Sequence, residues 1–156
     1  MAIVAILAAT AIVNFGKNDD RDVRMEKDRL TSFVREVQNK SLAVEKRLEV
    51  VPPAKVCGFG VRKNPSENKI ESFYVTSSLE DCSTNWTSYL SSVTVLNTFY
   101  PTNGITLDPF GSVFFLSPNG NTSCYNCALP TSAVQIGITK GAVNLKVTID
   151  PSGRIY

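Results

Sequence analysis

The hydrophobic pattern of the chain changes twice, and each change predicts a different structure. Thirteen of the first fifteen residues are apolar, and no charged side chain occurs before Lys17. Apolar residues then recur at steps of three and four as far as residue 48, as on one face of an α-helix. From residue 56 apolar and polar residues alternate in several segments, which is typical of strands. We therefore expect one long N-terminal helix followed by strands only.

The amphipathic helix is expected to bury its apolar face against a sheet, because a lone helix with one apolar face must cover it. It has to end before Pro52 and Pro53, which cannot continue a helix. The charged residues between the apolar positions are expected to form a solvated face. The residues expected to pack on the sheet are Val23, Leu30, Phe33, Val34, Val37, Val44 and Leu48.

The strand segments predict an antiparallel sheet. The clearest alternation runs over residues 143–149, with apolar side chains at every second position. The other predicted strands cover residues 56–62, 70–76, 93–100, 105–107, 112–116 and 134–138, and residues 154–156 fold back as an edge strand. The fold class predicted from this order is α+β: a long N-terminal helix, its apolar end projecting, packed on an antiparallel β-sheet. The expected division is a hydrophobic helix over residues 1–16, an amphipathic helix over 17–50 and a β domain over 51–156.

Charge and composition exclude several classes of function. The net charge of the 156 residues is +2, and residues 17–49 carry seventeen of the thirty charges. Such a small net charge, with Arg154 lying outside any basic patch, does not favour nucleic-acid binding. The chain has no histidine, which is the commonest general base and metal ligand, and its carboxylates form no recognisable pair. We therefore expect no enzyme activity, no cofactor, no metal and no small-molecule substrate.

The four cysteines are Cys57, Cys82, Cys124 and Cys127. An even number is typical of an exported domain with two disulfides. The spacing of Cys124 and Cys127 is that of a CxxC motif, but it lies among loop-forming residues and lacks the βαβ context of a redox motif. The simplest pairing is Cys57 with Cys82 and Cys124 with Cys127, although four cysteines allow three pairings and the sequence does not choose among them.

The apolar start has three interpretations: a signal peptide, a membrane anchor or an assembly helix. At about 15 residues it is short for a membrane span, which needs ~20, and it lacks the basic flank of a signal peptide. Small residues at 8–11 nevertheless fit a cleavage site. The alternative of a secreted ligand- or surface-binding β domain behind a signal peptide therefore stays open at this point.

Several segments resemble one family. AIVAILAATAIVNF is similar to the inner part of the N-terminal helix of type IV pilins. DRLTSFVREVQNKSLAVEK resembles the stretch that follows it in minor pilins and in pseudopilins of the general secretion type. NGITLDPFGSVFFLSPNG and VNLKVTIDPSGRIY are similar to two β-hairpins of these proteins. The sequence departs from the family in one respect: the leader, the processing glycine and the assembly glutamate are absent, because the resemblance begins within the mature helix.

The resemblance implies a pilin-like fold and a structural role. The chain would be a minor pilin or pseudopilin of a type IV pilus or a type II secretion-type filament. Its implied partners are other such subunits, inner-membrane assembly proteins and membrane lipid. It would be held in the cytoplasmic membrane by a single pass, with its globular domain outside the cytoplasm, before joining a cell-surface or periplasmic filament. The implied membrane and assembly residues are Ile3, Val4, Ile6, Leu7, Ile12, Val13 and Phe15.

Overall fold

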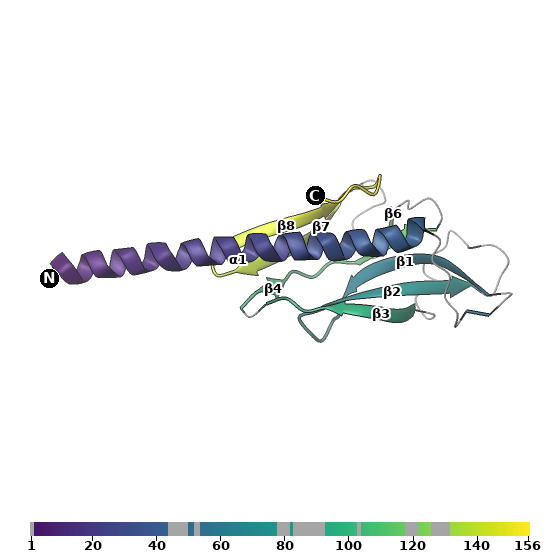
Figure 1. Cartoon of the computed structure of the whole chain (residues 1–156), viewed down its shortest axis with the longest axis horizontal. Coiled ribbons are helices and arrows are strands. Elements are labelled where there is room, and N and C mark those ends of the chain that lie inside the picture. The colour runs from purple at the N-terminus through teal and green to yellow at the C-terminus, as the bar shows by residue number, and fades with distance from the viewer. Residues whose placement is uncertain are drawn as a thin grey trace.

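The fold is seen in a computed structural model of the whole chain (Figure 1). Its described part contains one helix, α1 (Ala2–Leu42), followed by eight strands. For residues 2–17 and 123–125 the backbone alone is described. The residues that the structure describes are 2–43, 50–51, 54–77, 82, 93–102, 104–117, 122–125 and 132–156.

The larger of the two sheets is antiparallel and has the strand order β3-β2-β1-β5-β6. The predicted strands 56–62 and 70–76 correspond to β1 and β2, which pair along their length as an antiparallel hairpin. β5 pairs with the other edge of β1, which makes β1 the central strand. The five strands are β1 (Lys55–Lys63), β2 (Ile70–Ser77), β3 (Val93–Phe99), β5 (Ser112–Leu116) and β6 (Thr122–Tyr125).

The smaller sheet contains β4 (Thr106–Leu107), β7 (Val134–Lys140) and β8 (Val143–Ile149), in the order β4-β7-β8. The β7–β8 hairpin turns at Gly141, whose φ of +57° lies in the left-handed region that favours glycine. Ile155 bridges to Ile149, so the last residues fold back along β8 as the sequence predicted.

The predicted fold class, a long helix packed on one antiparallel sheet, is wrong. The structure is a β-rich fold with two separate antiparallel sheets. The reason lies in long-range pairing, because β5 joins β1 while the neighbouring β4 joins β7. The segment between β3 and β5 therefore leaves the larger sheet and contributes β4 to the smaller one. The alternation of residues along each strand does not encode this choice of partner.

One asparagine links the two sheets. Asn68, in the turn between β1 and β2, donates from Nδ2 to the carbonyl of Ile105 at 2.7 Å. Its Oδ1 accepts the backbone N–H of Leu107 in β4 at 2.9 Å. The side chain thus satisfies two backbone groups at the entrance to the smaller sheet, where β4 is only two residues long.

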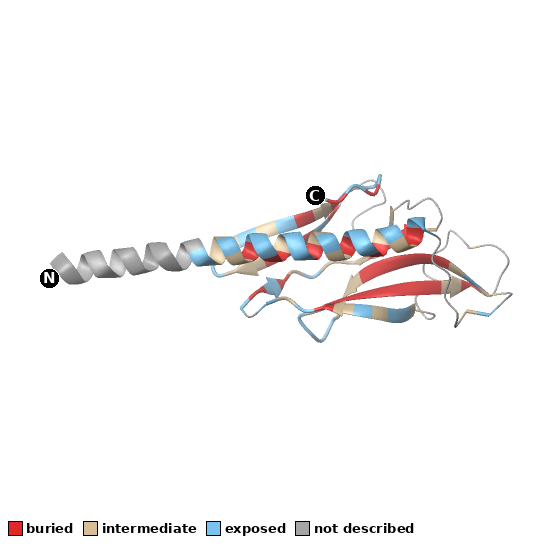
Figure 2. Ribbon diagram, viewed as in Figure 1, coloured by how far each residue is buried: buried red, intermediate tan, exposed pale blue. Residues whose placement is uncertain are grey.

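The main hydrophobic core is shared by α1 and both sheets (Figure 2). It includes Leu30 from the helix, Phe59 and Phe115 from the larger sheet, and Ile136 and Ile138 from the smaller one. All five side chains are fully buried. Both sheets and the helix therefore share this main core.

A second, smaller core lies on the opposite face of the larger sheet. Phe73 and Phe114 meet there edge to face, with 5.2 Å between ring centroids. Their neighbours in sequence, such as Tyr74 and Phe115, belong to the main core, as expected for side chains that alternate between faces. The Phe73 ring lies against Gly60, where a Cβ atom would come within 2.6 Å of the ring and 2.5 Å of the Val113 carbonyl oxygen.

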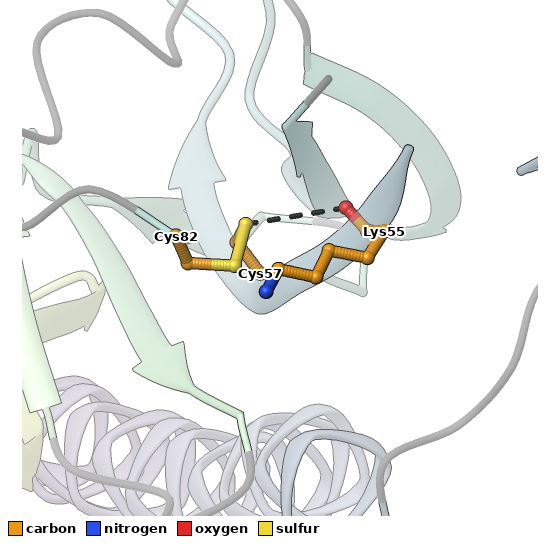
Figure 3. The surroundings of a disulfide bond; sticks show 3 residues. All are labelled: Lys55, Cys57 and Cys82. Carbon is orange, nitrogen blue, oxygen red and sulfur yellow. Dashed lines mark hydrogen bonds between the residues drawn. A yellow bond between two sulfur atoms is a disulfide. The ribbon is translucent and has the colours of Figure 1, made fainter. Parts of the chain in front are cut away.

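The predicted Cys57–Cys82 disulfide is confirmed, with 5.5 Å between the two Cα atoms (Figure 3). Cys57 is buried in the smaller core near the start of β1, and its Sγ lies 3.9 Å from the Lys55 carbonyl oxygen. The bond closes a segment of 25 residues. The side chains of Cys124 and Cys127 lie outside the described part of the chain, so their predicted pairing stays a prediction.

We expect Gly60→Ala to lower the free energy of unfolding by about 1–3 kcal/mol, because the new methyl group collides with a ring and with backbone. Urea unfolding measures this change. Thr94→Ala on exposed β3 is the control and should change stability by about 0.5 kcal/mol or less. A Gly60→Ala variant as stable as the unmodified chain would contradict the close contact with Phe73.

We expect removal of the Cys57–Cys82 bond to cost about 3 kcal/mol, because the unfolded chain regains the entropy of a loop of this length. Cys57→Ala with Cys82→Ala is compared with its parent, both carrying Cys124→Ser and Cys127→Ser. Urea unfolding should then show the loss under oxidising conditions and little difference under reducing conditions. Equal stability under oxidising conditions would count against the bond.

Candidate assembly helix

The candidate functional element is α1, whose described side chains begin at residue 18. The helix contacts β1 and β5 of the larger sheet and β7 and β8 of the smaller one. Val23, Leu30, Val34 and Val37 are buried, and their spacing puts them on one helix face. Phe33 is half-buried beside them. This face fixes the C-terminal half of α1 to the rest of the fold.

An aromatic contact joins one side of this face to β3. The rings of Phe33 and Phe99 lie 5.6 Å apart, and the Arg29 guanidinium lies 5.1 Å from the centre of the Phe99 ring. Contacts of both kinds add to the stability that apolar burial alone supplies. They bind α1 to the last residue of β3, an edge strand of the larger sheet.

Glu26 is a buried carboxylate within this mostly apolar face. Only 1% of its surface is exposed. Both of its oxygens accept hydrogen bonds from Arg29 Nη1, at 2.7 and 2.9 Å, and one also accepts from the Thr102 hydroxyl at 3.2 Å. A buried charge is costly unless it is paired in this way. The charge pattern predicted Glu26 on the solvated face, although the residue lies three after Val23 and four before Leu30, which is the spacing of the buried face.

Three further side chains of α1 donate hydrogen bonds to backbone carbonyls. Arg35 donates to Ile155 at 2.9 Å and Gln38 donates to Gly153 at 2.7 Å, which connects the helix to the C-terminal residues. Ser41, fully buried, donates to Phe115 in β5 at 2.7 Å. These bonds link α1 to β5 of the larger sheet and to the C-terminal residues that fold back along β8.

The first turn of α1 whose side chains are described, residues 18–22, contacts the tip of the β7–β8 hairpin. Lys140 Nζ lies 2.5 Å from Asp22 Oδ2 and 3.3 Å from Asp19 Oδ1. Hydrogen bonds to Asp22 and Asp19 raise the pKa of Lys140 above its usual value. A raised lysine pKa contributes stability that is complete below about pH 10.4 and is lost as the pH rises through the pKa of the folded state.

The described residues cover only some of the predicted site. Val23, Leu30, Val34 and Val37 are buried in the main core. The described helix ends at Leu42, and Val44 and Leu48 lie outside the described residues. The same is true of the side chains of the predicted assembly residues, which all precede residue 18. The sequence also did not predict that Glu26 would be buried or that Lys140 would contact the helix.

The described part of the chain holds no group of three or more histidine, cysteine, aspartate or glutamate side chains placed to bind a metal ion. Asp108 lies against Gly137, so the carboxylate occupies the space that a Cβ atom at residue 137 would need. Two other carboxylates of the β region, Glu80 and Asp81, lie outside the described residues.

Within the described part of the chain, no helix combines the length and the apolar character that crossing a membrane requires.

We expect Leu30→Ala to lower the free energy of unfolding by about 2–5 kcal/mol, because it leaves a cavity between α1 and the sheets. Leu42→Ala is a matched control on the same helix, where the leucine is 47% exposed, and should cost far less. Circular dichroism at a helix wavelength and a strand wavelength would follow unfolding of both variants. A Leu30→Ala variant in which the sheets unfold well after the helix would contradict a shared core.

Comparison with known proteins adds no family to these observations. No protein-family model matches the chain, and no curated protein or solved structure shows a significant match to it. The resemblance to type IV pilins therefore rests on the residues of the chain alone. What the chain does has to be argued from the sequence of α1 and from the way its C-terminal half is held.

Proposed function

We propose that the chain is a structural subunit, a minor pilin or pseudopilin, which is anchored and assembled through the N-terminal part of α1. One observation carries the proposal. α1 is a single helix from Ala2 to Leu42, and its N-terminal part extends beyond both sheets while its C-terminal half belongs to the core (Figure 1). The part that extends is the apolar run of the sequence.

An apolar helix outside the core of its own domain requires another apolar environment. Residues 2–17 would be about 24 Å long as a helix, at 1.5 Å per residue. A helix that is apolar on all sides is typical of a segment buried in lipid or among other helices. Leaving such a surface in water costs about 25 cal/mol for each Å² of apolar area. Lipid before assembly, and the helices of neighbouring subunits afterwards, would both provide this environment.

The β-rich part would then be the outward domain. The Cys57–Cys82 disulfide supports a location outside the cytoplasm, because such bonds persist in oxidising compartments. The proposed sequence of events is anchoring in the cytoplasmic membrane, followed by assembly with other subunits and inner-membrane assembly proteins into a cell-surface or periplasmic filament. Enzyme activity and a small-molecule substrate have no part in this proposal.

Vesicle flotation tests the anchoring step. We expect the purified full chain to float with vesicles of phosphatidylethanolamine and phosphatidylglycerol. Leu7→Asp should lower the bound fraction at least about tenfold, because a carboxylate at the centre of a membrane helix costs about 2.5–3.5 kcal/mol. Leu42→Asp makes the same change at an exposed position of the same helix and should float like the unmodified chain.

Photo-crosslinking on the vesicles tests assembly. A benzoylphenylalanine at position 12, within the apolar run, should give covalent oligomers, and one at exposed Asn144 in β8 should give far fewer. If the unmodified chain neither floats with the vesicles nor forms crosslinked oligomers, the proposal is contradicted. Cleavage near residues 9–11 during export, with release of a soluble domain, would instead support a secreted binding domain behind a signal peptide.

A further inference from the structure

An ionic contact joins the tip of the β7–β8 hairpin to residues 18–22 of α1. Lys140 lies between Asp19 and Asp22, which are one turn apart on α1. The three side chains are only partly exposed, at 24% for Lys140, 29% for Asp19 and 38% for Asp22. One lysine therefore holds two carboxylates of the helix against the smaller sheet.

The backbone of the hairpin is shaped for this approach. Gly141 adopts a φ of +57°, which lets the chain reverse directly after Lys140. A Cβ atom at residue 141 would come within 2.9 Å of Asp19 Oδ2, so the hairpin tip and the helix are in close contact beside the ion pairs. The close approach at Gly141 and the ion pairs of Lys140 thus place the hairpin tip against the same turn of α1.

This contact lies where α1 leaves the domain, so a small change of helix direction at this point moves the N-terminal residues over a large distance. Val23, the first buried residue among the described side chains of the helix, follows Asp22 directly. Toward the N-terminus α1 continues for seventeen residues from Asp19 to Ala2, which is about 25 Å of helix. A change of 20° in helix direction at Asp19 would move Ala9, ten residues away, by about 5 Å.

We infer that Lys140, Asp19 and Asp22 form a clamp that fixes the direction in which the N-terminal part of α1 leaves the domain. Arg35, Gln38 and Ser41 bind the helix further along, so the clamp and these bonds hold α1 at two separated regions. Val23 and Glu26 are buried directly after the clamp, so the clamp is the last described contact before the helix leaves the domain, and its loss would shorten the held part of α1 by about one turn. The inference goes beyond the proposed function, because it concerns the direction of the helix and not what the helix binds.

Electron–electron double resonance on the full chain in detergent micelles tests the clamp. Spin labels are attached through p-acetylphenylalanine at position 9 and at exposed position 94 of β3, which leaves every cysteine unchanged. We expect Lys140→Met to broaden the distance distribution about twofold while the midpoint of thermal unfolding stays within a few degrees. Salt at 1 M should broaden the distribution of the unmodified chain in the same direction but by less, since screening weakens partly exposed ion pairs less than fully exposed ones.

Lys146→Met is the matched control. Lys146 lies on the same hairpin but binds Gln135, 2.8 Å away, rather than a carboxylate of the helix, so its loss should leave the distribution unchanged. If Lys140→Met does not fold, Asp22→Asn removes the shorter pair from the helix side and should broaden the distribution too. Unchanged distributions in folded clamp variants would overturn the inference. Because this readout needs neither vesicles nor oligomers, it is independent of the flotation result.

Discussion

The fold depends on the burial of one face of α1 in a core that belongs to two sheets at once. Side chains of the helix, of β1 and β5, and of β7 and β8 form a single cluster. A sheet of three strands, one of them two residues long, has little apolar surface of its own to bury. The smaller sheet thus gains stability mainly by packing against the helix. This constraint explains why a helix with so many charges is nevertheless integral to a β-rich domain.

Polar contacts then determine how the helix sits in that core. Apolar burial is non-directional, so it tolerates some rotation and sliding of α1. Hydrogen bonds tolerate much less, because their distances and angles are narrowly limited. Glu26 would be a buried unpaired charge if the helix turned away from Thr102 and Arg29, and Ser41 would lose its acceptor on β5. The cost of leaving such groups unsatisfied selects one rotation and one axial position.

The sequence predicted what is local and missed what is long-range. The helix follows from a spacing of three and four residues, and the β1–β2 and β7–β8 hairpins follow from short turns between alternating segments. The division into two sheets depends on which distant strand each segment joins, and β4 and β5 join different ones although they are neighbours in sequence. The alternation of apolar and polar side chains indicates which face of a strand is buried, but it does not indicate which other strand pairs with it.

The candidate site shows the same limit. Its apolar residues repeat along the helix and could be predicted, whereas the function of a single charge depends on its partner. Glu26 and Glu36 belong to the same helix, yet the first is buried against Thr102 and the second pairs with Lys40 at an exposed position. Lys140 is 118 residues from Asp22, a separation that no local pattern spans. The direction of α1 is thus set by distant contacts, even though the apolar character of its N-terminal part is local. The proposed function would need both, because the surface of α1 would determine what it can enter and its direction would determine how the domain is presented to neighbouring subunits.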